Sequence, residues 1–423
     1  LTVHGVFMFL AMMAVSAAAL DMSRLMAVRS QLQVAADTGA HAALYMRETL
    51  SSTDAIEAAI GLVRTDMPQE DHGVVVDSSD ITFGHFDADT GAFTADSSSR
   101  DAVLVRARLT AERSNPVEAF FFKMVGYDEF AVGAYSVYET YRPTCLTEGF
   151  VANGVVDVQS NNLYGGGFCV HSNSYVSLNS NSTFEPGSII SMPDPALLDM
   201  PTSGSDTNPG LDEALRAGSY RLRILDRLDD IIAGLDAGDY EYLPPYIDGT
   251  GMTVLYGNGG KLETADFTPG RLHRYTCHSY NGTVTIDTEP GVPLSEVVLV
   301  TNCKVKFGEG AMLEDVVIAT TSTSDRSITA PNGLTVGYDD GCAEGGGAQL
   351  LTKGSMNFAS SLSLFGAQLM AEGDITFSAN ADGIEGASMV AGGEISGTSN
   401  MAMGYCGGGM ETAYAADYFR LRR

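Results

Sequence analysis

The chain has 423 residues, of which 53 are acidic and 24 are basic, so its formal net charge is −29 at pH 7. This charge argues against nucleic acid as a partner, because phosphate recognition needs clustered lysine and arginine. The length predicts two or three domains in addition to any anchoring segment.

Residues 1–20 form an apolar run that contains no Asp, Glu, Lys or Arg. Twenty helical residues span about 30 Å, which is the thickness of the hydrocarbon core of a bilayer. Since no initiator Met or basic leader precedes the run, we expect processing in front of the apolar segment, as in pilin-type precursors, and not behind it. The sequence therefore predicts a transmembrane or pilin-like helix. Its expected membrane or assembly contacts are Val6, Phe9, Met13, Ala14, Ala17, Leu20 and Leu32.

Residues 21–64 continue this helix without a Pro, and we expect one nearly continuous helix from Leu1 to about Leu50 within an N-terminal domain at 1–66. Small and apolar side chains recur every three to four residues. They are Leu25, Val28, Leu32, Ala35, Ala36, Ala40, Ala43 and Leu44. Two interpretations stay open: a membrane anchor with a stalk, or a helix that packs against copies of itself or related subunits.

Residues 67–142 are predicted to form a small α+β module. Short strands are expected at 74–76, 81–86, 102–109 and 130–137. Asn115-Pro116 is expected to open a short helix over 117–125, because Pro is favoured in the first helical turn.

Several phrases of this N-terminal third carry a family resemblance. LDMSR at 20–24 is followed by RSQLQVAAD at 29–37, then by FGHFDADTGAF at 83–93 and NPVEAFF at 115–121. They resemble the TadE/TadG-type proteins of the tight-adherence (Flp/Tad) pilus system over roughly residues 1–140. Gly5 is a departure, since pilins commonly carry Glu there. The resemblance implies pilus assembly or a minor, tip-located subunit, with the inner membrane and other pilus or pilin-like subunits as partners.

Residues 143–423 are rich in Gly, Ser and Asn and contain an internal repeat. Similar stretches begin at Gly347, Gly366 and Gly386, and an earlier pair begins at Gly167 and Gly187. Because each unit holds short alternating runs separated by Gly or Asn, we expect a parallel β-solenoid in which Leu350, Leu369 and Met389 stack, as do Phe358 and Phe377. A β-sandwich is the alternative. A helical insertion is expected at 193–245, with its best helix over 211–235.

The chain has six cysteines and no CxxC pair, and downstream of an export segment disulfides are favoured. Fifteen pairings are open, of which we choose nearest neighbours: Cys145–Cys169, Cys277–Cys303 and Cys342–Cys406. His273, Cys277, His278 and Cys303 are the alternative, a zinc set; we favour a disulfide beside two exposed histidines.

The catalytic inventory is thin, and we expect no enzyme, cofactor or metal site. No G-x-S-x-G, H-E-x-x-H, Walker or dinucleotide motif occurs. The predicted function is therefore a surface protein of a Tad-type system that displays its β-solenoid for adhesion to an unknown surface ligand. It would lie in the bacterial inner membrane with periplasmic or extracellular domains, or on a surface pilus. Alternatives are a homo-oligomeric filament subunit and a tethered carbohydrate-active enzyme, for which the repeat acids are candidates: Glu372, Asp374, Asp382, Glu385 and Glu394.

Overall fold

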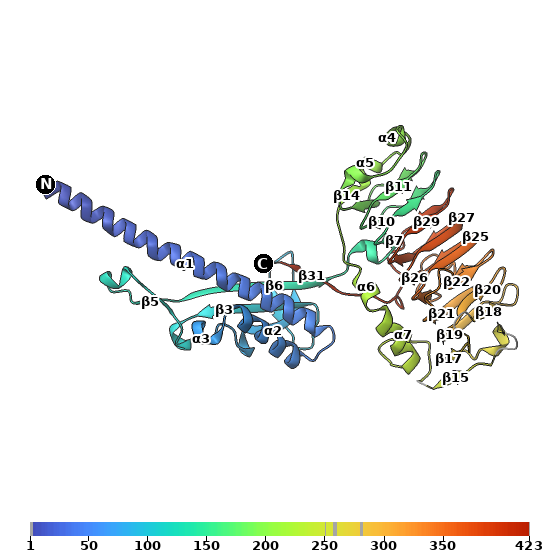
Figure 1. Ribbon diagram of the computed structural model, residues 1–423, viewed down its shortest axis with the longest axis horizontal. Coiled ribbons are helices and arrows are strands. Elements are labelled where there is room, and N and C mark those ends of the chain that lie inside the picture. The colour runs from blue at the N-terminus through green and yellow to red at the C-terminus, as the bar shows by residue number, and fades with distance from the viewer. Residues whose placement is uncertain (1–2, 250, 257–259, 280–281, 423) are drawn as a thin grey trace. The chain divides into compact units, whose positions relative to one another are not determined.

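The computed structural model describes residues 3–249, 251–256, 260–279 and 282–422, with the side chains of 125, 205 and 379–382 also outside the description. Leu1, Thr2 and the side chain of Asp382, on which expectations fell, are therefore not described. The chain divides into two compact units, Leu1–Tyr141 with Asp417–Arg423, and Arg142–Ala416. Each unit is described by itself (Figure 1).

The first unit is built on one long helix. α1 (Val3–Arg47) is continuous, as expected, and is followed by α2 (Ser52–Asp66) and α3 (Gln69–His72). Ser51 caps α2 by accepting from the amide of Asp54. The C-terminal half of α1 and α2 pack on an antiparallel sheet of order β2-β1-β3-β6-β31. Its strands are β1 (Ile81–Phe86), β2 (Phe93–Ala95), β3 (Ala102–Leu109), β6 (Val132–Tyr141) and β31 (Tyr418–Leu421).

The small-residue stripe of α1 is buried inside this unit. Leu32, Ala36 and Ala40 have no exposed surface, and they belong to one cluster with Val103 and Val105 of β3. The expectation that this stripe packs against copies or related subunits is wrong for these residues, because the chain's own sheet covers them. Residues 3–20 remain the part of α1 without a covering surface in the structure.

The helix expected over 117–125 is absent, which corrects the sequence analysis. Val117–Glu118 (β4) pairs with Glu129–Phe130 (β5), and only Phe122–Val125 form a 3₁₀ turn, η3. The physical reason is a distant carboxylate, that of Asp21, which accepts hydrogen bonds from the backbone amides of Phe120, Phe121 and Phe122. A helix prediction from the local sequence takes no account of a hydrogen-bond partner about a hundred residues away.

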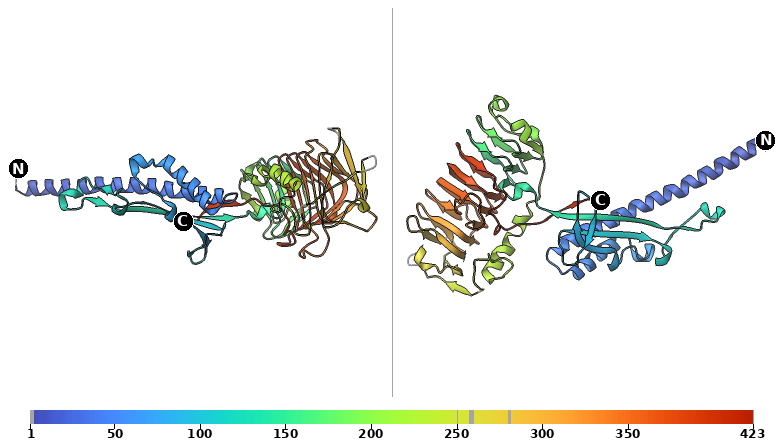
Figure 2. Two further views of the ribbon diagram at one scale, coloured as in Figure 1. Left: turned by 90° about the horizontal axis from the view of Figure 1, so that it is seen from below. Right: turned by 180° about the vertical axis from the view of Figure 1, so that it is seen from behind.

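The second unit consists of parallel strands stacked in register, which Figure 2 shows as successive rungs. One ladder contains β7 (Gly149–Ala152), β10 (Cys169–Ser172), β13 (Ile189–Met192), β14 (Leu215–Ala217), β15 (Met252–Val254), β17 (Arg271–Tyr275), β19 (Leu294–Thr301), β21 (Met312–Thr320), β24 (Ala348–Thr352), β26 (Ala367–Ala371) and β28 (Ser388–Ala391). Its strands β7, β24, β26 and β28 are buried on both faces, whereas β14 and β15 at its two ends are partly exposed.

Adjacent ladders complete each repeat. Beside β7 run β8 (Val156–Val158) and β9 (Leu163–Tyr164), which pair with β11 (Val176–Leu178) and β12 (Thr183–Phe184) of the next repeat. The remaining strands are β16 (Lys261–Glu263), β18 (Thr283–Asp287), β20 (Lys304–Phe307), β22 (Ile328–Ala330), β23 (Thr335–Val336), β25 (Met356–Phe365), β27 (Ile375–Glu385), β29 (Ile395–Gly397) and β30 (Ala402–Gly404).

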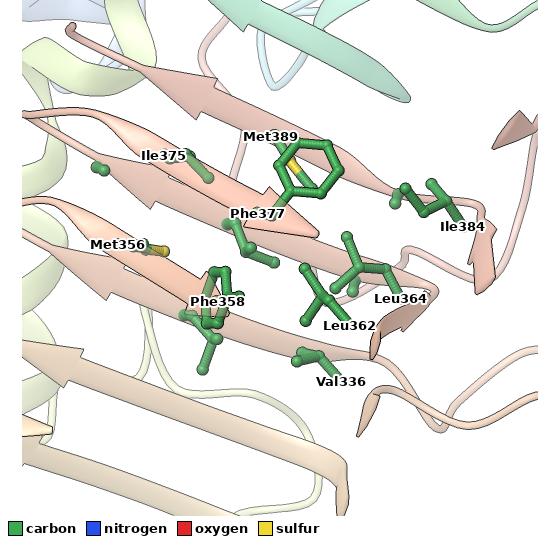
Figure 3. Packing of buried hydrophobic residues seen from close by; sticks show 14 of the residues in the cluster. Val336, Met356, Phe358, Leu362, Leu364, Ile375, Phe377, Ile384 and Met389 are labelled. Atoms are coloured by element: carbon green, nitrogen blue, oxygen red, sulfur yellow. The ribbon is translucent and has the colours of Figure 1, made fainter. Parts of the chain in front are cut away.

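The expected stacking of the repeats is present. Leu350 pairs with Leu369, Leu369 pairs with Met389, and Phe358 pairs with Phe377. These side chains are at most 2% exposed and belong to one apolar cluster, in which Figure 3 labels Phe358, Phe377 and Met389. Pairings between the described strands of this unit are parallel, unlike the antiparallel pairing expected of a β-sandwich.

The order of the repeats along the stack differs from their order in the chain. Met389 of the last repeat pairs with Phe150 of the first, and Phe150 pairs in turn with Val170 of the second. The repeat at 149–164 therefore lies between those at 388–404 and 169–184. After β14 the chain runs through α6 (Arg223–Asp226) and α7 (Leu228–Ala237) and resumes pairing at the other end, with β15 on β17.

The insertion is helical, but the long helix expected over 211–235 is broken. α5 (Leu211–Ala214) ends where Leu215–Ala217 pair as β14 with β13, and helix resumes only in α6 and α7; α4 (Gly204–Thr207) precedes them. Strand pairing with the stack overrides the helical period here. α7 buries Leu228, Ile231, Ile232 and Leu235 against the outward side of the first ladder.

The second unit is inserted into a hairpin of the first. Tyr141 at the end of β6 pairs directly with Tyr418 at the start of β31. The expected domain at 143–423 therefore differs from the structure at its C-terminal end, since β31 completes the sheet of the first unit. The stalk and the module, expected as separate domains at 1–66 and 67–142, share one core.

Candidate functional site

A cleft of about 490 Å³ opens between α7 and the strand ends of the first ladder. α7 contributes Asp229, Ile232, Ala233 and Asp236, and the strand ends and following turns contribute Arg274, Tyr275, Thr276, Val300, Thr301, Asn302, Thr321 and Lys353. The cleft is thus lined by hydroxyl, amide and charged groups together with a larger apolar surface, to which Ile232, Ala233 and Val300 contribute. Such a mixed lining suits a ligand that has apolar surface to bury and a few polar groups for hydrogen bonds.

Two ion pairs fix α7 along this cleft. The guanidinium of Arg274 lies 2.6 Å from the carboxylate of Asp236 and also donates to the Asp236 carbonyl at 2.9 Å. The ammonium of Lys353 lies 2.6 Å from Asp229, and this hydrogen bond raises the pKa of Lys353. Because each of these cations has a carboxylate partner, the two ion pairs hold α7 beside the strand ends.

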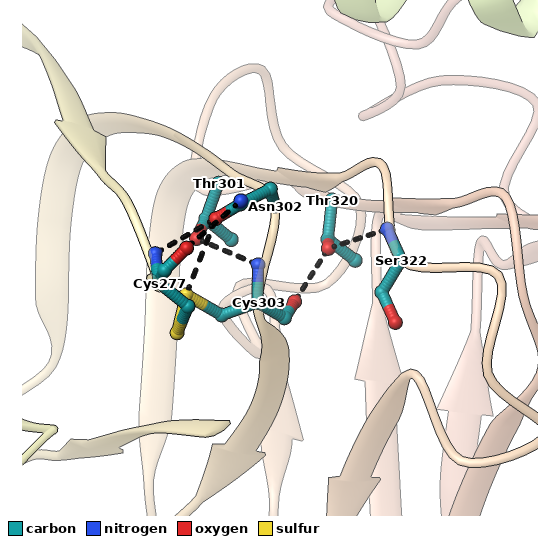
Figure 4. Close-up of a disulfide and its surroundings, with 6 residues drawn as sticks. All are labelled: Cys277, Thr301, Asn302, Cys303, Thr320 and Ser322. Atoms are coloured by element: carbon teal, nitrogen blue, oxygen red, sulfur yellow. Dashed lines mark hydrogen bonds between the residues drawn. A yellow bond between two sulfur atoms is a disulfide. The ribbon is translucent and has the colours of Figure 1, made fainter. Parts of the chain in front are cut away.

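Beside the cleft, polar side chains at the strand ends join successive repeats (Figure 4). Asn302 accepts from the amide of Cys277 at 2.8 Å and donates to its carbonyl at 3.1 Å, so its side-chain amide pairs with the backbone of the preceding repeat. Thr320 donates to the carbonyl of Cys303 at 2.6 Å and accepts from the amide of Ser322 at 3.1 Å. These bonds continue the ladder beyond the point where the strands end.

The structure forms three disulfides, Cys145–Cys169, Cys277–Cys303 and Cys342–Cys406, which are the nearest-neighbour pairs chosen from the sequence. The zinc alternative loses its thiolates, because Cys277 and Cys303 are bonded to each other. His273 is fully buried, which corrects the expectation of two exposed histidines. Its ring packs on Phe267 and accepts from the amide of Thr268 at 3.1 Å, while His278 is exposed.

A further group near the third disulfide has the spacing of a metal site. Glu385 lies close to Cys342 and Cys406, but both sulfurs are consumed by the disulfide. The neighbouring carboxylate of Glu148 accepts from the amides of Cys406 and Gly407, each at 2.6 Å, and burial raises its pKa. Glu148 therefore braces the turn at Cys406 and Gly407, and with both sulfurs bonded to each other the donor set does not fit a metal.

The described candidate acids of the enzyme alternative lie at turns between repeats and beside the third disulfide. Asp374 accepts from the amide of Glu394 at 2.8 Å and so closes a turn between repeats. Burial raises the pKa of Glu372, and Glu385 lies beside the disulfide. Asp374 and Glu394 therefore meet at one turn between repeats, whereas Glu385 lies beside the third disulfide.

The predicted assembly helix residues lie in two environments. Val6, Phe9, Met13 and Leu20 are 46–62% exposed, and Ala14 and Ala17 are on the same uncovered stretch, whereas Leu32 is buried in the first unit. Within the described residues, α1 is the helix that is long and apolar enough to cross a membrane. The sequence did not predict that residues of α7 line a cleft, because their position beside the strand ends depends on the order of the repeats. The acidic and apolar alternation of 228–237 was the available signal.

Comparison with known families supports both parts of the chain. Residues 149–407, more than half of the sequence, match the family described as domain of unknown function DUF7867. The chain belongs to the DUF7867 family. In this DUF7867 protein, residues 2–48 also match the family described as putative Flp pilus-assembly TadE/G-like, in agreement with the resemblance seen in the sequence. No curated protein and no solved structure matches the chain.

The Tad-like segment coincides with α1, whose first half is apolar and uncovered. The two findings together fit a membrane-anchored protein with an extracellular domain, or one associated with a pilus. They also support a role in a Tad system.

Proposed function

We propose that this DUF7867 protein is a non-enzymatic surface component of a Tad-type pilus system. In this proposal α1 anchors it in the membrane or among pilus subunits, and the second unit is a β-solenoid displayed for adhesion. The observation that carries the proposal is the TadE/G-like match over residues 2–48, on a helix whose apolar half is exposed.

The architecture supports display over a direct part in the anchor. The second unit enters and leaves through the paired residues Tyr141 and Tyr418, as inserted domains do when their ends lie close together. The anchor and its sheet thus remain continuous around it. The cleft beside α7 offers a surface of apolar and polar groups on which an adhesion ligand can be held.

The insertion suggests a test in cells. In a hairpin variant, residues 142–417 are replaced by Asn-Gly, which favours the two-residue turn that joins antiparallel strands. We expect the variant to fractionate with membranes and to support normal pilus numbers, but to lose attachment to surfaces. A matched control carries the same Asn-Gly pair after Tyr141 with the second unit retained.

Two results would count against the proposal in different ways. Loss of pili in the hairpin variant would assign the second unit to assembly, which is the alternative within the Tad system. Unchanged attachment of the hairpin variant would show that the second unit does not mediate adhesion.

A further inference from the structure

The β4–β5 hairpin lies along α1 in a defined direction. Gln33 donates to the carbonyl of Tyr135 at 3.1 Å, and Arg24 donates to the carbonyl of Glu118 at 3.2 Å. Asp21 then holds the amides at 120–122. From β6 to the end of the hairpin, each contact is therefore made by an earlier residue of α1. In Figure 1 this hairpin accordingly lies beside α1, between the sheet and the N-terminal end of the helix.

Asp21 ties the hairpin end to α1 directly after the charge-free run. Its carboxylate accepts from the amides of Phe120 at 3.2 Å, Phe121 at 2.8 Å and Phe122 at 2.8 Å, and the residue is only 4% exposed. A buried carboxylate with several amide donors is a strong, charge-assisted attachment. The end of the hairpin is thereby held at the level where the apolar segment stops at Leu20.

The side chains at this level are unusual for a water-facing loop. Phe120 is 69% exposed, Met124 86% and Tyr127 61%. The sequence from 119 to 127, AFFFKMVGY, carries a single charged residue, Lys123, which pairs with Glu118 at 3.3 Å. Large exposed apolar side chains gathered in one loop mark an interaction surface.

We propose that residues 119–127, here called the aromatic tip, insert into the lipid interface of the membrane that α1 spans. The adjoining surface is the uncovered apolar face of α1 itself, with Phe7, Phe9 and Met13 more than half exposed, so the tip continues a surface already assigned to lipid. Phe and Tyr favour the headgroup level, and a Lys there extends its ammonium toward water. The tip thus sets the depth and tilt of the first unit.

The sequence offers a clean probe, because it contains no Trp. The full-length chain is placed in phosphatidylcholine vesicles as the Phe120→Trp or Tyr127→Trp variant, with and without bromine on the acyl chains. The matched control is Tyr135→Trp. Tyr135 is also an exposed aromatic residue, but it lies beside Gln33, about 18 Å further along α1 than Asp21. Far-UV circular dichroism verifies that each variant keeps its fold.

The proposal predicts blue-shifted Trp emission for the two tip variants and loss of most of that emission in brominated vesicles, with little change for the control. Emission typical of water and equal quenching in tip and control variants would overturn it. A blue shift without quenching would also overturn it, since the tip would then be covered by protein and not by lipid.

Discussion

Three asparagines occupy the same corner of adjacent repeats. Asn400, Asn161 and Asn181 have φ of 63°, 62° and 67°, and the pairing of Ala402 with Leu163 and of Leu163 with Thr183 places them in register. Asn tolerates this left-handed conformation better than other residues with a Cβ. The expectation that Asn marks the turns therefore has a backbone cause.

Substitution at one corner isolates this effect, because the side chain of Asn181 is exposed. We expect Asn181→Ala to lower the free energy of unfolding by about 1–2 kcal/mol, the cost of a left-handed conformation for an ordinary residue. Asn181→Gly should be nearly neutral and serves as the control. Equal losses in both variants, measured by urea denaturation, would show that side-chain contacts matter more than φ.

His171 makes the stability of the second unit sensitive to pH. Its side chain is fully buried, and burial lowers its pKa. Its ring nitrogens lie 2.6 Å from the Ser191 hydroxyl and 3.0 Å from the side-chain amide oxygen of Asn173. An unfolded His takes up a proton near pH 6.5, whereas this buried one resists it. The unfolded state then binds more protons, so stability should fall as the pH drops below about 6.5.

Burial also lowers the pKa of His273, so the two residues should contribute in the same direction. The measurement is the urea midpoint between about pH 7.5 and about pH 5.5, a window above the titration of ordinary carboxyl groups. His171→Gln should show a shallower decline than the wild-type chain. Parallel declines would mean that other groups cause the pH dependence.

At the scale of elements, one column of side chains runs through the stack. Ile318, Leu350, Leu369, Met389 and Phe150 follow one another in register, all with no exposed surface. Each repeat buries its apolar side only against its neighbours, so stability depends on the interfaces between repeats.

Leu369→Ala should leave a void between Leu350 and Met389 and lower the free energy of unfolding by about 2–5 kcal/mol. Leu369→Met, which nearly conserves volume, should cost less than about 1.5 kcal/mol. Calorimetry of the full chain compares the two. A loss at alanine no larger than at methionine would place this residue outside a packed interior.

Periodicity predicted the elements whose partners are local or repeated. α1, β1, β3 and the stacking of the repeats from Gly347 onward follow from helical spacing, alternation and self-similarity. The elements that failed depend on distant partners: Asp21 displaces a helix over 117–125, and β13 recruits residues 215–217. The cleft beside α7 shares this dependence, because its walls come from segments separated in sequence.

At the scale of the whole chain, the order of the repeats could not be read from the sequence. The first repeat pairs with the last, through Phe150 and Met389, so the stack is complete only when the C-terminal repeat is present. After the last repeat the chain returns to the first unit, where β31 pairs with β6 and completes the sheet. The two units are thereby linked through the paired strands β6 and β31.

The central claim is that α1 anchors the chain while the second unit is displayed outside. Antibody against residues 142–416 on intact cells tests it most directly, with Ala14→Arg as the variant and Glu48→Arg, beyond the apolar run, as the matched control. An Arg near the middle of a spanning helix costs about 2.5–3.5 kcal/mol on insertion scales. We predict surface labelling of the wild type and the control and its loss in Ala14→Arg; labelling only after permeabilisation, or unchanged labelling of Ala14→Arg, would contradict the claim.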